Sequence, residues 1–272
     1  MIERLNDPQV NVIKTLAVYK FLTTSQMVRL GVCFDKSNLQ KHIVGIRDRK
    51  TPYIYGTGPK TLAGAGRLES VYYLSPLGVE VAKELGISDP KYPINKYISH
   101  TQDYYHRKSV IDFEISVRSM PVEVEVFDRY FDTVGNNRND SNLTSKTKVD
   151  FATGSLKADG IFILNIPELN ERYLYCLEVH NGKDTKRALE QMAPYVNALA
   201  VKAPSQKYNF ERGCRVLWLF EEEGCMKATQ ERAMQDANLA RAEKLFLCKL
   251  QSDPQNIFFD WLTLKGEKVN MF

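Results

Sequence analysis

The first part of the chain shows three helical patterns in succession. Apolar residues recur at helical spacing over residues 8–20, and the segment SQMVRL (25–30) follows. Thr23 and Gln26 precede and open this second segment with the spacing of a capping box, which favours a helix start there. A third helix is predicted over residues 35–50, and it is the most basic of the three.

The pattern changes to strand type after residue 51. The segments PYIYG (52–56) and ESVYYLS (69–75) flank a Gly-rich basic connection, which predicts a hairpin, and a further helix is predicted over residues 76–86. This order of helix, helix, basic helix, hairpin and helix resembles a winged helix-turn-helix domain, which we assign to residues 1–88. The resemblance implies that the third helix enters the major groove of DNA while the hairpin lies along the backbone.

A segment containing two prolines separates this domain from the rest of the chain. We assign residues 89–97 to a linker and residues 98–272 to a second domain. A long helix is predicted over residues 99–119, with Glu114 as the acid nearest its middle. His106 lies in the same helix, and isolated histidines of this kind are surface residues or satisfied core residues more often than ligands.

The second domain then alternates strand and helix patterns. Strands are predicted in the segments 122–131, 147–151, 156–164 and 172–182, and we expect them to form an antiparallel core. A helix over 183–200, a strand over 213–220, a helix over 228–245 and closing strands within 246–264 complete the pattern. The expected fold class is α+β or α/β, with a mixed sheet flanked by helices.

Two carboxylates are predicted to meet across neighbouring strands. If the hairpin is symmetric about the loop 165–172, Leu164 pairs with Tyr173 and Asp159 with Glu178. Directly opposed side chains have Cβ atoms about 4.5–5.5 Å apart, where like charges destabilise the sheet. A divalent cation such as Mg²⁺ would remove this conflict, and strand alternation places His180 on the same face as Glu178.

These residues carry a resemblance to a known superfamily. Asp159, followed on the next strand by Glu178-Val179-His180, resembles the D…E-x-K pattern of the restriction-endonuclease-like, or PD-(D/E)xK, superfamily. Gln191 and Tyr195 on the following helix are similar to the Q-x-x-x-Y element of some exonuclease-like branches. With a winged helix ahead of this core, the whole arrangement resembles the plasmid replication-relaxation family and the related MobC-type relaxases.

The resemblance implies metal-dependent cleavage of a phosphodiester bond. Asp159 and Glu178 would hold Mg²⁺ or Mn²⁺, Glu114 could add an outer ligand, and Gln191 with Tyr195 would position the DNA backbone or support the site. His180 stands where the superfamily has a lysine. Three alternatives follow: His180 serves as base or ligand, Lys183 or Lys186 reaches into the site, or the domain binds DNA without cleaving it.

The charge distribution favours DNA binding over two alternatives, namely a protein–protein module and a charged helix face that is only solvated. Residues 36–67 contain seven Lys or Arg and one Asp, a local charge of +6 within a chain whose net charge is +4. Such a cluster is typical of surfaces that bind the phosphate backbone. The side chains expected to contact DNA are Asn38, Lys41, His42, Arg47, Arg49, Lys50, Lys60 and Arg67.

Other features narrow the function further. The five cysteines are scattered, which favours reduced thiols, and no apolar run approaches the ~20 residues of a membrane helix, so we expect a cytoplasmic protein. No phosphate-binding loop or nucleophile elbow occurs. The leading hypothesis is a DNA-nicking, relaxase-like protein of a plasmid or other mobile element, acting on double-stranded DNA at an origin or transfer origin. A second copy of the chain and accessory replication or transfer proteins are candidate partners. The alternative is a non-catalytic DNA-binding accessory factor or regulator.

Overall fold

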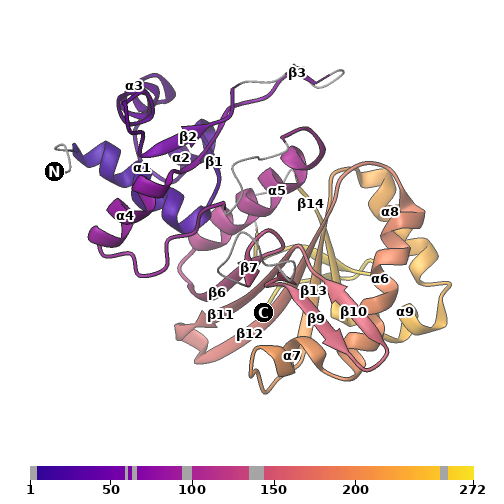
Figure 1. Cartoon of the computed structure of the whole chain (residues 1–272). Helices are drawn as coiled ribbons and strands as arrows, with labels where there is room; N and C mark the ends of the chain where they lie inside the picture. The colour runs from indigo at the N-terminus through magenta and orange to yellow at the C-terminus, as the bar shows by residue number, and fades with distance from the viewer. Residues whose placement is uncertain (1–4, 59–60, 63–65, 94–99, 135–143, 252–256) are drawn as a thin grey trace. The chain divides into compact units, whose positions relative to one another are not determined.

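The computed structural model describes residues 5–58, 61–62, 66–93, 100–134, 144–251 and 257–272 of the chain (Figure 1). The chain divides into two compact units, Met1–Tyr104 and Tyr105–Phe272. Residues 94–97 of the predicted linker lie outside the described residues. The helix α5 (His100–Arg118) crosses the division, and its buried residues Val110, Phe113 and Val117 belong to a core of the second unit.

The first unit combines helices with a small antiparallel sheet. Its helices are α1 (Asp7–Tyr19), α2 (Thr24–Arg29), α3 (Lys36–Arg47) and α4 (Pro76–Glu84). The strands β1 (Leu22–Thr23), β5 (Val71–Leu74) and β2 (Ile54–Gly56) pair in that order, and β3 (Thr61–Leu62) forms a hairpin with β4 (Gly66–Arg67). The predicted helices and the hairpin are confirmed, whereas the short strand β1 was not predicted.

Local signals in the sequence explain these helices. Thr23 and Gln26 form the predicted capping box at the start of α2, because each side chain accepts a hydrogen bond from the other residue's backbone N–H. Leu39, Ile43 and Ile46 of α3 are fully buried, as the apolar spacing predicts. Gly78 lets α4 approach β2, since an added Cβ would stand 1.9 Å from the carbonyl oxygen of Tyr53.

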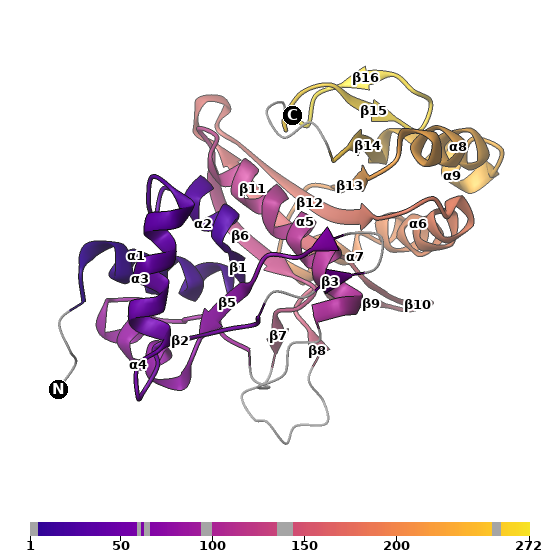
Figure 2. The same cartoon turned by 90° about the horizontal axis from the view of Figure 1, so that it is seen from above.

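The second unit contains a seven-stranded mixed sheet. In spatial order its strands are β16 (Lys268–Val269), β15 (Trp261–Thr263), β14 (Phe246–Leu250), β13 (Cys214–Phe220), β12 (Glu171–His180), β11 (Gly160–Ile166) and β6 (Glu123–Arg129). The central strands β12, β13 and β14 run parallel, and all other pairs in this sheet are antiparallel. Figure 2 shows β14, β15 and β16 side by side next to α8 and α9.

Helices cover both faces of this sheet (Figure 1). The helices of the second unit other than α5 are α6 (Thr185–Ala200), α7 (Ala203–Lys207), α8 (Glu223–Ala233), α9 (Ala237–Arg241) and the 3-10 turns η1 (Pro167–Leu169) and η2 (Glu243–Leu245). Residues of α6 and α8 bury one face together with Trp218 and Phe246. Residues of α5 bury the other face together with Phe162 and Leu177.

Two small hairpins accompany the main sheet. The strand β9 (Lys148–Phe151) pairs with β10 (Gly154–Lys157), and β7 (Thr133–Val134) pairs with β8 (Thr144–Ser145). The β9–β10 hairpin forms a separate two-stranded sheet and packs against α6 and α7 (Figure 1). The predicted strand 147–151 is therefore real, but it is not part of the core sheet.

Three further sequence-based expectations need correction. The antiparallel core is wrong for the centre of the sheet, because β12 pairs in parallel with β13, and β13 with β14. The single strand expected over 156–164 breaks at Ala158 and Asp159, between β10 and β11. The helix expected over 228–245 begins earlier, at Glu223, and ends at Ala233, where Asp236 then caps α9.

Candidate functional site

Asp159 and Glu178 lie at the end of the β11–β12 ladder, as the hairpin register predicts. Leu164 pairs with Tyr173, and the last ladder pair is Gly160 with Leu177. Beyond that pair, the N–H of Asp159 donates to the carbonyl oxygen of Leu177 at 3.0 Å, a bond offset by one residue from the ladder register that keeps Asp159 next to β12. The N–H of Val179 donates to Oδ2 of Asp159 at 2.8 Å, which fixes this carboxylate beside Glu178.

Glu178 is a buried acid that faces a second acid. Its side chain accepts a hydrogen bond from the hydroxyl of Tyr195, and only 6% of the residue is exposed. Burial raises the pKa of Glu178 well above its ordinary value, and the negative charge of Asp159 raises it further. The charge of Lys157 acts in the opposite direction. The two carboxylates are thus close enough for the charge on one to oppose ionisation of the other.

His106 holds the other oxygen of Asp159. Its Nε2 lies 2.7 Å from Oδ1 of Asp159, across 53 residues of sequence. The ring of His106 packs edge-on against Tyr130, with centroids 5.3 Å apart, and the N–H of Tyr130 donates to the carbonyl oxygen of Asp159. Sequence reasoning set His106 aside as an isolated histidine. A signal was present, because His106 precedes Val110 by four residues and so extends the buried stripe of α5 by one turn.

His180 lies on the α6 face of β12, two residues beyond Glu178, and is only 2% exposed. Burial lowers its pKa, and the positive charge of Arg187 lowers it further, although the side chain of Gln191 and the backbone of Asp184 favour the charged ring. Among the described residues, Nε2 of His180 has no hydrogen-bond partner. The imidazole is therefore neutral near pH 7, and its Nε2 is a buried polar atom at the site.

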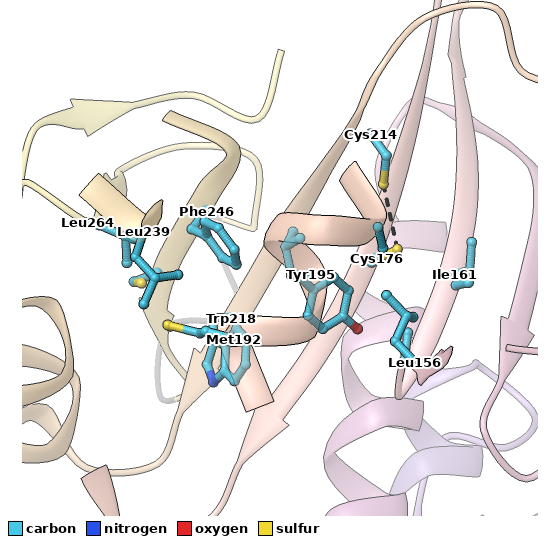
Figure 3. Close-up of a cluster of buried hydrophobic side chains, with 14 of the residues drawn as sticks. Leu156, Ile161, Cys176, Met192, Tyr195, Cys214, Trp218, Leu239, Phe246 and Leu264 are labelled. Atoms are coloured by element: carbon cyan, nitrogen blue, oxygen red, sulfur yellow. Dashed lines mark hydrogen bonds between the residues drawn. The ribbon is translucent and has the colours of Figure 1, made fainter. Parts of the chain in front are cut away.

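Tyr195 reaches Glu178 from the buried face of α6. Figure 3 shows its ring among Met192 and Trp218 of the apolar core, and the rings of Tyr195 and Trp218 meet edge to face at 6.3 Å. Burial raises the pKa of Tyr195, and the charge of Glu178 adds to this, so the hydroxyl stays a donor at neutral pH. Gln191 and Tyr195 therefore interact with His180 and Glu178, which lie on the same face of β12, as their spacing of four predicts.

The candidate lysines lie outside this buried cluster. Lys183 is exposed in the turn between β12 and α6. Lys186 is exposed on the first turn of α6, where its Nζ lies 3.8 Å from a carboxylate oxygen of Glu190. Neither lysine stands in the position of the missing E-x-K lysine, which His180 occupies on the strand.

Glu114 has a different environment from the one expected of an outer metal ligand. It is fully buried, and its two oxygens lie 2.9 Å from Nε of Arg118 and 3.1 Å from Nη1 of Arg129. Arg129 also pairs with Asp132 at 2.9 Å. Because an arginine holds each oxygen of Glu114, these contacts describe a buried ion network and give no support to metal ligation by this residue.

The residues expected to contact DNA lie on α3 and around the hairpin of the first unit. Asn38, Lys41, Lys50 and Arg67 are exposed, His42 is half-buried, and Lys60 lies outside the described residues. Arg47 and Arg67 line an open groove of about 390 Å³ together with Gln40 of α3 and Tyr72 of β5. Two of the basic side chains have local partners: Arg47 forms two hydrogen bonds to Asp48, and Nε of Arg49 donates to the carbonyl oxygen of Gly45.

Comparison with known proteins found no relative of this chain. No family model, no curated protein and no solved structure matches the chain. Within the described residues, no group of three or more His, Cys, Asp or Glu side chains is arranged to hold a metal ion, and no helix is both long and apolar enough to cross a membrane. Any assignment of function therefore depends on the residues and geometry described above.

Proposed function

We propose that this protein binds double-stranded DNA through its first unit and nicks it through metal-dependent hydrolysis at Asp159 and Glu178. In this proposal the second unit is a variant of the restriction-endonuclease-like fold, and the protein acts as a relaxase-like factor in the replication or transfer of a mobile element. The observation that carries the proposal is the buried carboxylate pair at the end of β11 and β12. Two opposed acids cost stability unless a cation or a proton lies between them.

The first unit supports the DNA-binding part of the proposal. Its order of three helices, a hairpin and a fourth helix resembles that of a winged helix-turn-helix domain, which supports this part of the proposal. In such a domain α3 enters the major groove, and its outward residues Asn38 and Lys41 are exposed as this role requires. The groove containing Arg47 and Arg67 lies between α3 and the hairpin strands, where phosphates would pass.

The donor set at the carboxylate pair fits Mg²⁺ or Mn²⁺. Both ions prefer carboxylate oxygens and bind through one or two carboxylates plus water and phosphate oxygens, so a third protein ligand is not required. The neighbouring orphaned Nε2 of His180 is a further polar atom that is available to the site. A bound divalent cation would polarise the scissile phosphate and lower the pKa of an attached water.

The protein's own side chains have separable roles in this proposal. His106 and the N–H of Val179 orient Asp159, while the hydroxyl of Tyr195 orients Glu178. His180 is neutral near pH 7 and can therefore accept a proton or orient water through Nε2. Lys183 is exposed in the adjoining turn, where it can contact a phosphate.

A second candidate is a DNA-binding factor that does not cleave. The observation in its favour is that Asp159 already accepts hydrogen bonds at both oxygens, from Val179 and at the His106 contact, while His180 replaces the expected lysine. In this alternative a shared proton replaces the cation between Asp159 and Glu178, and the second unit serves as a binding module.

Plasmid nicking separates the two candidates. The intact protein should convert supercoiled plasmid to open circle with Mg²⁺ or Mn²⁺. Asp159→Asn and Glu178→Gln should each lower this rate about 100-fold or more while leaving DNA affinity unchanged. Glu168→Gln, which changes an exposed acid in the η1 turn, is the matched control. Metal-independent nicking, or equal nicking by Glu178→Gln, would refute the assignment, and tight DNA binding without nicking would favour the second candidate.

A further inference from the structure

A cavity lies at the same end of the sheet as the carboxylate pair, on the opposite face. It has a volume of about 210 Å³ and lies between α5 and the last residues of β13 and β14, with Leu219 and Leu250 in its wall. Leu219 pairs with Val179, the residue between Glu178 and His180 on β12. Ligands of sheets with parallel strands commonly bind outside the carboxyl ends of those strands, which is where this cavity lies.

The cavity has one polar wall and one apolar wall. The polar wall comes mainly from α5, where Lys108, Ser109 and Asp112 supply donors and acceptors, and Nζ of Lys108 lies 2.6 Å from Oδ2 of Asp112. The apolar wall includes Phe113, Leu219 and Ile257. A flat heterocycle with amino and carbonyl groups along its edge matches this combination, because its faces are apolar and its edge needs hydrogen-bond partners.

A hydrogen-bonded chain connects the cavity with the strand that carries Glu178 and His180. Ser109 donates to Oε1 of Gln251 at 2.9 Å, and Nε2 of Gln251 donates to Oδ1 of Asn181 at 2.8 Å. Asn181 directly follows His180 at the end of β12. The contents of the cavity and the position of the β12–α6 turn are therefore physically linked.

The size of the cavity limits the ligand. Pockets for drug-sized molecules have volumes of about 300–1,000 Å³, whereas a cavity of ~150 Å³ accepts benzene. At about 210 Å³, the cavity suits a single heterocycle better than a whole nucleotide. Along the end of the sheet, the β13–β14 pair lies two strand spacings, or about 10 Å, from the β11–β12 pair.

We propose that this cavity receives one unpaired nucleobase of the DNA strand that passes the carboxylate pair. The proposal rests on the DNA-cleaving function proposed above and adds a substrate requirement, namely a strand that is unpaired close to the cleavage point. A base in the cavity would fix the register of the strand relative to Asp159 and Glu178. The same chemistry would also admit the base of a free nucleoside, so the test must separate the two sources.

The test uses the full chain, with Ser109→Phe to fill the cavity and Ser119→Phe, an exposed position at the end of the same helix, as the matched control. Saturation-transfer NMR with adenosine, guanosine, cytidine and thymidine measures free nucleosides. The fluorescence of single-stranded oligonucleotides that carry one 2-aminopurine measures whether that base leaves its stack with the neighbouring bases. Gln251→Ala, which keeps the cavity open but removes its polar partner, provides a second variant.

We expect the 2-aminopurine signal at one position of the oligonucleotide to fall at least tenfold in Ser109→Phe and to persist in Ser119→Phe. Gln251→Ala should change which nucleoside gives the strongest transfer. Oligonucleotide binding with the same 2-aminopurine response in Ser109→Phe would overturn the cavity assignment while leaving DNA binding intact. Nucleoside transfer without any oligonucleotide binding would show that the cavity serves free nucleosides, which overturns the proposal that it receives a base of the DNA strand. The plasmid-nicking assay tests the proposed function separately.

Discussion

Replacing Glu178 with glutamine tests the conflict between the two carboxylates directly. Glutamine has nearly the same shape, and its carbonyl oxygen can still accept the hydrogen bond from Tyr195, so the substitution removes charge and little else. Because burial and Asp159 raise the pKa of Glu178 in the folded state, the folded protein retains a proton there that the unfolded chain releases. Stability from this group is fully present below the unfolded pKa and is lost as pH rises through the folded pKa.

The expected magnitude follows from the size of that shift. Each unit by which the folded-state pKa of Glu178 exceeds its unfolded value corresponds to about 1.4 kcal/mol of stability lost when the group ionises. For a chain of this size, that free energy corresponds to a difference in Tm of about 3–6 °C. Glu178→Gln should therefore match the Tm of the parent protein at pH 4 and exceed it at pH 8 in the absence of divalent metal.

The assay is thermal unfolding from pH 4 to pH 9 with chelator, for the parent protein, Glu178→Gln and the surface control Glu168→Gln. Adding Mg²⁺ or Mn²⁺ at pH 8 should reverse the order, because a ligand at 100 times its Kd stabilises the folded state by about 2.7 kcal/mol. Only the proteins that keep Glu178 should gain this stability. Parallel Tm curves for the parent and Glu178→Gln across the whole pH range would refute the opposed-carboxylate reasoning.

Two further substitutions test other parts of the structure. Arg129→Met should lower the free energy of unfolding by about 3–5 kcal/mol, because it leaves Glu114 and Asp132 buried without their shared cation. Urea unfolding measures this loss. A loss under about 1 kcal/mol would contradict the buried network, because it is well below the range expected for a broken buried pair. Lys41→Glu should weaken DNA binding and reduce the slope of the logarithm of the DNA-binding constant against the logarithm of the salt concentration by about one ion. The control Lys14→Glu on α1 should change neither the affinity nor the slope. Equal effects of the two substitutions would contradict the role of α3.

The parts of the site that follow from local sequence were predictable. The position of Asp159 close to Glu178 follows from the symmetry of a short loop, since the pairing of Leu164 with Tyr173 fixes the ladder as far as Gly160 and Leu177. The capping box of Thr23 is equally local. The parallel pairing of β12 with β13 was also within reach, because a long helical connection, here α6, is how parallel strands are joined.

The contacts that depend on distant parts of the chain were not predictable. His106 contacts Asp159 only because α5 packs across the sheet, and the sequence around His106 does not indicate which residue it will contact. Glu114 lies on the same helix and was expected near the metal, but it forms a buried ion pair with Arg129 of β6 instead. Helix periodicity tells which face is buried and leaves open which side chains of the sheet that face meets.

Position 180 adds no positive charge to the carboxylate pair beyond the one that Lys157 supplies. A lysine at position 180 would place its ammonium in a position only 2% exposed and near Arg187, whereas the neutral imidazole of His180 avoids that cost. No charge is then supplied from that position to balance Asp159 and Glu178. A fold selected for stability alone would need only glutamine at position 178, since Tyr195 would keep its acceptor. In the metal-dependent function that we propose, the glutamate would bind a divalent cation, and a reversal of the Tm order on adding metal would distinguish a cation from a retained proton.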